Sequence, residues 1–159
     1  MSEPAAAHQA ATAAAPVPLR PGLFVPDEGG RLRLAGSRCP RCGACYFPRR
    51  LVCARCLATD LEVVGLSSRG TVYTYTVVHQ STPEFPTPYV LAYVDLPDGV
   101  RVLAPLADID PSDVRIGAPV DLRVEPVRAT SDGRPVLAYR GYPCQVPHGQ
   151  DVAREVRDG

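Results

Sequence analysis

Two closely spaced cysteine pairs constrain this chain more than any other feature. Cys39 and Cys42 form one C-x-x-C pair, Cys53 and Cys56 form a second, and ten residues separate the pairs. Two such turns brought face to face supply the four soft ligands that Zn²⁺ takes at tetrahedral corners. Gly43 directly after Cys42 favours this interpretation, because a tight knuckle turn needs a residue that tolerates positive φ. The spacing predicts one structural Zn²⁺ held by Cys39, Cys42, Cys53 and Cys56, with no position left open for substrate.

The sequence leaves two alternatives to this ligand set. Cys45 lies three residues after Cys42, so these two residues form another C-x-x-C pair, but Gly43 favours Cys39 as the partner and leaves Cys45 as a free thiol nearby. The second alternative is a disulfide framework. We expect no secretory segment, and paired C-x-x-C spacing in an intracellular protein more often indicates metal. Cys144 is interpreted as a small apolar residue.

The two ends of the chain have compositions that disfavour a packed core. The first 21 residues are rich in Ala and Pro, and residues 145–159 are polar and uneven. Such segments cannot bury enough surface to offset their ordering entropy, so we expect a disordered arm over 1–21 and a flexible tail over 145–159. No apolar run fits a signal peptide or the roughly 20 residues that cross a bilayer, and we expect a cytoplasmic protein without a membrane partner.

The net charge of zero hides two regions of opposite sign. Residues 31–56 contain seven arginines and no acidic residue, whereas residues 60–159 contain nine arginines and 14 acidic residues. A four-cysteine zinc centre carries about −2, so the first region is still about +5 with metal bound. Its arginines suit the phosphates of CoA, with which guanidinium pairs bidentately. The alternative is a solvated basic face, or one that meets an acidic patch on a partner protein. The arginines concerned are Arg38, Arg41, Arg49, Arg50 and Arg55.

Beyond the cysteines, apolar residues recur with a period of two, which is typical of strands. In residues 71–79 this alternation puts Val72, Thr74, Thr76 and Val78 on one face. Asp-Gly pairs at residues 98–99 and 132–133 predict turns, and residues 110–112 predict a single helical turn. We expect strands over 71–79, 89–96, 100–106, 120–126 and 136–142, with a further strand over 61–66 joining the ribbon to this set.

This number and spacing of strands favours a small barrel. An OB fold fits best, with a two-sheet sandwich as the alternative, and Gly70 and Gly141 are expected at bends where strands change direction. The predicted fold class is mainly β: an N-terminal rubredoxin-like zinc ribbon over 22–60, followed by a five-stranded OB-fold barrel over 61–144.

Several segments together resemble a known family. They are the four-cysteine ribbon with Cys-Gly after its first pair, Tyr46-Phe47-Pro48-Arg49 between the pairs, the strand from Gly70 to Thr76, the stretch from Pro88 to Leu96 followed by Gly99, and Ile116 to Val120. This combination resembles the zinc-ribbon/OB-fold proteins that accompany thiolases and acyl-CoA hydratases. The likeness covers about residues 31–144.

The resemblance implies a non-catalytic accessory subunit. Such a subunit binds a thiolase-like or hydratase-like partner and supports its reaction on an acyl-CoA substrate, in lipid or steroid, aromatic or polyketide metabolism. A CoA thioester at the shared interface is part of this expectation. Many family members begin with an amphipathic helix, but Pro21, Pro26, Gly29 and Gly30 prevent much of one here.

The residues themselves predict no catalytic site. His79 ends a strand near Glu84, but no spacing signature joins them, and we assign no catalytic residue. Four tyrosines are interpreted as core or interface residues rather than a stacking platform: Tyr73, Tyr75, Tyr89 and Tyr93. The alternative function is single-stranded nucleic-acid binding by a zinc-ribbon/OB protein, which the basic ribbon favours and the acidic barrel disfavours. The Pro-rich apolar loop over 80–88 suits docking to a protein surface.

Overall fold

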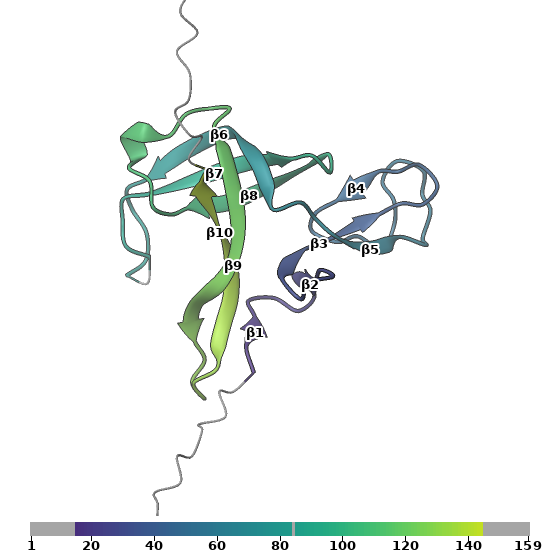
Figure 1. The fold of residues 1–159 in the computed structure, drawn as a ribbon, viewed down its shortest axis with the longest axis horizontal. Coiled ribbons are helices and arrows are strands. Elements are labelled where there is room, and N and C mark those ends of the chain that lie inside the picture. The colour runs from purple at the N-terminus through teal and green to yellow at the C-terminus, as the bar shows by residue number, and fades with distance from the viewer. Residues whose placement is uncertain (1–14, 84, 145–159) are drawn as a thin grey trace, which may run out of the picture.

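The computed structural model describes residues 15–83 and 85–144, and it consists of a small ribbon lobe beside a barrel (Figure 1). Four strands form the ribbon sheet: β2 (Phe24–Pro26), β3 (Leu32–Arg38), β4 (Cys45–Tyr46) and β5 (Glu62–Gly65). β3 is the centre of this sheet, because β2, β4 and β5 all pair with it in antiparallel register. The ribbon cysteines lie in the loops that β3, β4 and β5 hold together.

Five longer strands form the barrel: β6 (Arg69–Val78), β7 (Tyr89–Leu96), β8 (Val100–Leu106), β9 (Pro119–Ala129) and β10 (Pro135–Pro143). β6, β7 and β8 form an antiparallel meander, and β9 and β10 form a hairpin. A short 3₁₀ turn, η1 (Pro111–Asp113), lies between β8 and β9 and is capped by the Asp110 carboxylate, which accepts from the Ser112 amide. The predicted helical turn is therefore confirmed.

Two pairings close the sheet into a barrel. β9 returns to β6, where Gly70 lies opposite Val120, and β10 meets β8 in parallel at Gly141 and Leu106. The strand order around the barrel is β6-β7-β8-β10-β9, returning to β6. Closure leaves the apolar face of each strand inside, and the core consists mainly of Val, Leu and Ala side chains from these strands. The predicted fold class, a zinc ribbon followed by a five-stranded OB-fold barrel, is confirmed.

The predicted alternation within β6 is wrong beyond Val72. A β-bulge between Val72 and Thr74 inserts one extra residue, so Tyr73 and Thr74 are both exposed and Tyr75 turns inward against the core. The bulge shifts the phase of every residue that follows. The sequence pattern of Val and Thr on one face therefore does not describe the second half of the strand.

The strand pairing also shows where the ribbon ends and the barrel begins, a boundary predicted at residues 60 and 61. β5 pairs with β3 rather than with the barrel, so residues 62–65 belong to the ribbon sheet by hydrogen bonding.

β1 (Val17–Pro18), inside the predicted disordered arm, pairs in parallel with β10, because β10 extends past the barrel and offers free backbone groups there. The rest of the arm, residues 1–14, and the tail over 145–159 lie outside the described residues. No helix within the described ranges is long and apolar enough to cross a membrane.

The ribbon and barrel share core residues at their junction. Leu34 of β3 and Leu66 after β5 are buried in the barrel core. Asp98, in the β7–β8 turn, accepts a hydrogen bond from the Ser67 amide at 2.8 Å and lies 3.7 Å from the Arg38 guanidinium. These contacts fix the direction in which the ribbon projects from the barrel.

Gly70 tests the closure of the barrel. A Cβ at this position would meet the Asp95 carbonyl oxygen and lie 2.7 Å from side-chain atoms of Val94 and Leu96. We expect Gly70→Ala to lower the free energy of unfolding by about 1–3 kcal/mol, because backbone and packed side chains must move apart. The measurement is the midpoint of urea denaturation. Gly29→Ala, whose new Cβ would meet only an Asp27 carboxylate oxygen at 3.4 Å, is the control; equal midpoints for the two variants would contradict the prediction.

Candidate metal centre

The structure brings the four predicted cysteines together. The Sγ atoms of Cys39, Cys42, Cys53 and Cys56 all lie within 4.8 Å of one another. Cys39 and Cys56 are separated by 3.5 Å between their sulfurs, and so are Cys42 and Cys53. A tetrahedron with metal–sulfur bonds of about 2.3 Å has edges of about 3.8 Å. The four sulfurs therefore fit a tetrahedral zinc ion.

Both C-x-x-C turns use the same hydrogen bonds. The Gly43 amide donates to the Cys39 carbonyl at 2.9 Å, and the Leu57 amide donates to the Cys53 carbonyl at 2.9 Å. The residue after each second cysteine has positive φ, +72° for Gly43 and +60° for Leu57. The predicted role of Gly43 is therefore confirmed. At Leu57 the same left-handed backbone costs about 1–2 kcal/mol, because a Cβ crowds the neighbouring carbonyl.

Tyr46 of β4 contacts the cluster through its hydroxyl. That hydroxyl lies 3.2 Å from Cys53 Sγ, and its hydrogen bond lowers the pKa of Cys53 to about 6. At Cys56 the amide of Ala58 lowers the pKa, but the neighbouring thiols and burial outweigh it, and the pKa of Cys56 rises to about 12. The sulfurs thus resist ionising together unless a cation neutralises them. A site of this kind binds a metal in competition with protons.

The other two cysteines lie apart from this cluster. Cys45 of β4 is half-buried and packs against the barrel core, and Cys144 is half-buried at the end of the described chain. All six cysteines are free thiols, which gives the disulfide alternative no support.

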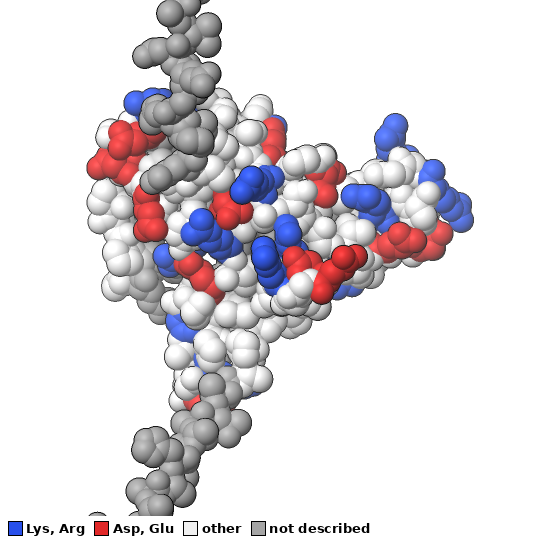
Figure 2. Space-filling model, in the orientation of Figure 1, with Lys and Arg blue, Asp and Glu red and all other residues white. Residues whose placement is uncertain are grey.

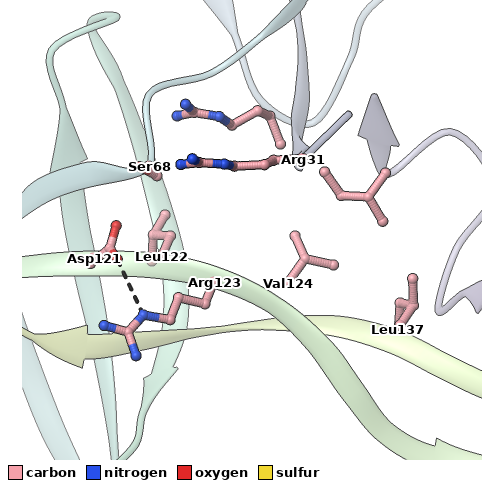
Figure 3. A pocket seen from close by; sticks show the side chains of 9 residues that line it. Arg31, Ser68, Asp121, Leu122, Arg123, Val124 and Leu137 are labelled. Carbon is pink, nitrogen blue, oxygen red and sulfur yellow. Dashed lines mark hydrogen bonds and ion pairs between the residues drawn. The ribbon is translucent and has the colours of Figure 1, made fainter. Parts of the chain in front are cut away.

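A cleft opens between the start of the ribbon sheet and the barrel (Figure 3). It has a volume of about 460 Å³. Arg31 and Ser68 lie on one side, opposite Asp121 and Arg123 of β9, which form an ion pair at 3.2 Å. Arg33 also borders the cleft and pairs with Asp27 at 3.1 Å. The arginines predicted to meet CoA phosphates, Arg38, Arg41, Arg49, Arg50 and Arg55, do not line this cleft. The cleft arises from tertiary contacts between β3 and β9 that no local pattern shows.

The outer face of β6, β7 and β8 exposes large apolar side chains. Tyr73, Tyr93 and Leu103 are all exposed there, and we call these three residues the barrel wall. Tyr93 lies opposite Leu103 and Thr74 in the strand register. Arg101 stacks on the Tyr73 ring, 3.1 Å from its centroid, and pairs with the Asp95 carboxylate at 2.6 and 3.0 Å. The wall is therefore aromatic and locally neutral.

Two other predicted features lie at one end of the barrel. His79, directly after β6, is exposed. The loop that follows it exposes Phe85, whose amide donates to the Thr82 carbonyl at 2.9 Å.

Comparison with known proteins identifies both units. Residues 27–62 match the rubredoxin-like zinc ribbon domain of ChsH2, and residues 63–125 match the C-terminal OB-fold domain of ChsH2. The chain is 37% identical over 119 residues to benzoylsuccinyl-CoA thiolase subunit BbsA of Geobacter metallireducens, covering 74% of this chain and 80% of that one. It is 39% identical over 115 residues to a DUF35 domain-containing scaffold protein of Methanocaldococcus jannaschii, covering 70% of this chain and 80% of that one.

A solved structure shows the same architecture. A chain of the Ltp2-ChsH2(DUF35) aldolase superposes with a TM-score of 0.60 at 32% identity, covering 70% of this chain and 84% of that one. The sequence matches and this superposition cover the ribbon and the barrel together. The chain belongs to the DUF35 family of zinc-ribbon and OB-fold proteins, to which ChsH2 belongs.

Proposed function

We propose that this chain is a non-catalytic accessory subunit of an acyl-CoA enzyme. It binds a thiolase-like or hydratase-like partner and supports that partner's reaction by organising its site. The observation that carries the proposal is the similarity, over most of the folded chain, to a protein named as a thiolase subunit. A second relative named as a scaffold protein agrees with a binding role.

One structural Zn²⁺ held by Cys39, Cys42, Cys53 and Cys56 belongs to this proposal. Bound metal supplies the positive charge that lets four adjacent sulfurs remain thiolates. Tyr46 donates its hydroxyl proton toward Cys53 and orients that sulfur. Among the described residues, the buried cluster around the site consists only of Cys39, Cys53 and Ala58, so bound metal replaces a hydrophobic core there.

The barrel wall favours a protein partner over nucleic acid. Proteins that hold single strands combine stacking aromatics with a positive groove along the backbone. Here Arg101, which stacks on the Tyr73 ring, is neutralised by Asp95, while Tyr73 and Tyr93 remain exposed. An aromatic, uncharged surface is typical of the centre of a protein interface.

The cleft between the ribbon sheet and the barrel is our proposed location for the phosphates of a CoA thioester at the shared interface. Three guanidinium groups border it, and leucines at positions 32, 122 and 137 supply apolar walls. Arg33 and Arg123 are already paired with carboxylates, whereas Arg31 forms no ion pair among the described residues. Arg31 is therefore the residue available for bidentate phosphate binding.

The zinc proposal predicts different outcomes for two cysteines that lie near each other in sequence. We expect Cys39→Ser to lose bound zinc and unfold the ribbon, because metal-binding energy is folding energy there. We expect Cys45→Ser to keep one zinc per chain, since Cys45 is outside the cluster. Zinc content is measured by plasma mass spectrometry on purified protein. Full zinc content in Cys39→Ser would show that the ligand assignment is wrong.

Co-purification tests the accessory role. We expect the tagged full chain to recover a thiolase-like or hydratase-like protein in stoichiometric amount from a lysate of the source organism, identified by mass spectrometry. The absorbance ratio at 260 and 280 nm measures nucleic acid in the same sample. Recovery of nucleic acid or of translation and repair proteins, without such an enzyme, would reject the proposal in favour of single-strand binding.

Arg31 tests the location of CoA. We expect Arg31→Ala to weaken CoA binding by the purified complex by about tenfold or more, because a hydrogen bond to a charged group contributes about 1.5–3 kcal/mol. Arg128→Ala, which removes an exposed arginine of β9 outside the cleft, is the control. Binding is measured by titration calorimetry. Equal affinities for the two variants would place the phosphates elsewhere.

A further inference from the structure

Leu57 occupies a position where leucine opposes folding. Its backbone is left-handed, with φ of +60°. In the first C-x-x-C turn, Gly43 occupies the equivalent position, with φ of +72°. The two turns share their hydrogen bonds, so glycine would serve equally well at either position. Leu57 is nevertheless 76% exposed, so little burial offsets the strain. A strained, exposed leucine next to the four-cysteine cluster indicates a role in binding rather than in folding.

Two further apolar residues lie on the same turn. Leu51 is 86% exposed, Val52 is also exposed, and both directly precede Cys53. The hydrogen bond from the Leu57 amide to the Cys53 carbonyl brings Leu57 back beside this segment. We call Leu51, Val52 and Leu57 the ribbon tip. The knuckle fixes its backbone, so the tip presents apolar side chains on a pre-organised surface.

Basic residues surround the ribbon tip. Arg49, Arg50 and Arg55 neighbour the tip residues in sequence and are exposed. None of these three arginines forms an ion pair within residues 15–83 and 85–144. Figure 2 shows basic side chains at the outer end of the ribbon lobe and acidic ones along its lower edge. An apolar centre with a cationic rim is complementary to an apolar pocket edged by carboxylates.

We propose that the ribbon tip docks into an apolar, carboxylate-edged pocket on the enzyme subunit, with Leu57 as its central anchor. This inference rests on the proposed accessory function and adds the surface through which the ribbon serves it. The apolar residues distinguish this contact from phosphate binding, for which the arginines alone would suffice. The shared core at the ribbon–barrel junction holds the tip in a fixed direction, so the ribbon and the barrel wall can engage one partner together.

Leu57→Gly separates docking from folding. Glycine relieves the left-handed strain, so we expect the variant to keep its zinc and to unfold at a higher urea concentration than the wild type. We expect its affinity for the enzyme subunit to fall at least tenfold, because the buried leucine is lost from the interface. The probe is the thiolase-like or hydratase-like subunit recovered with the full chain, expressed separately. Surface plasmon resonance measures the binding.

The controls keep the two proposals distinct. Ile116→Ala removes a 68% exposed aliphatic side chain on the barrel and should leave affinity within twofold of the wild type. If wild type binds the enzyme and Leu57→Gly binds equally well, the tip is not the docking site and the accessory function stands. An equal loss in Ile116→Ala would also overturn the tip assignment. If wild type binds no such enzyme, the accessory function itself fails.

Discussion

The mutual repulsion of four adjacent sulfurs governs the ribbon half of this molecule. Four thiolates within 4.8 Å of one another cannot coexist without a cation, and the buried set around them is small. The ribbon sheet supplies strands but little apolar mass, since β2, β4 and β5 are only two to four residues long. Every surface that the ribbon presents therefore depends on this one site.

The barrel contributes rigidity in a different way. Each strand from β6 to β10 pairs with two others, so the sheet closes, and the barrel core extends into the ribbon through Leu34 and Leu66. Asp98 adds a polar contact at the same junction, since it accepts from Ser67 and lies near Arg38. The four-cysteine cluster and the hydrophobic barrel are thus joined through β3. Cys39 of the cluster directly follows this strand, and Leu34 of the strand packs in the barrel core.

The sequence allowed much of this to be predicted, because the strongest signals are local. A nearly continuous apolar run and the Asp-Gly turn at residues 98–99 located β7 and β8 at their observed bounds, and the cysteine spacing identified all four members of the cluster. The bulge in β6 was missed because an inserted residue changes no composition, only the phase. The pairing of β1 with β10 and the cleft around Arg31 were missed because they depend on contacts between distant segments.

Leu57 illustrates a signal that sequence alone could not interpret. In the sequence it is an ordinary leucine beside a cysteine pair. Only the backbone of the folded chain shows that it has the positive φ that favours glycine. Strain at an exposed site is costly to stability and unhelpful to solubility, so selection for folding alone would replace it. The barrel wall carries the same contradiction in milder form, with two tyrosines and a leucine facing outward from a closed sheet. Both surfaces make physical sense if they are buried in a complex, which is the state that an accessory subunit occupies when it works.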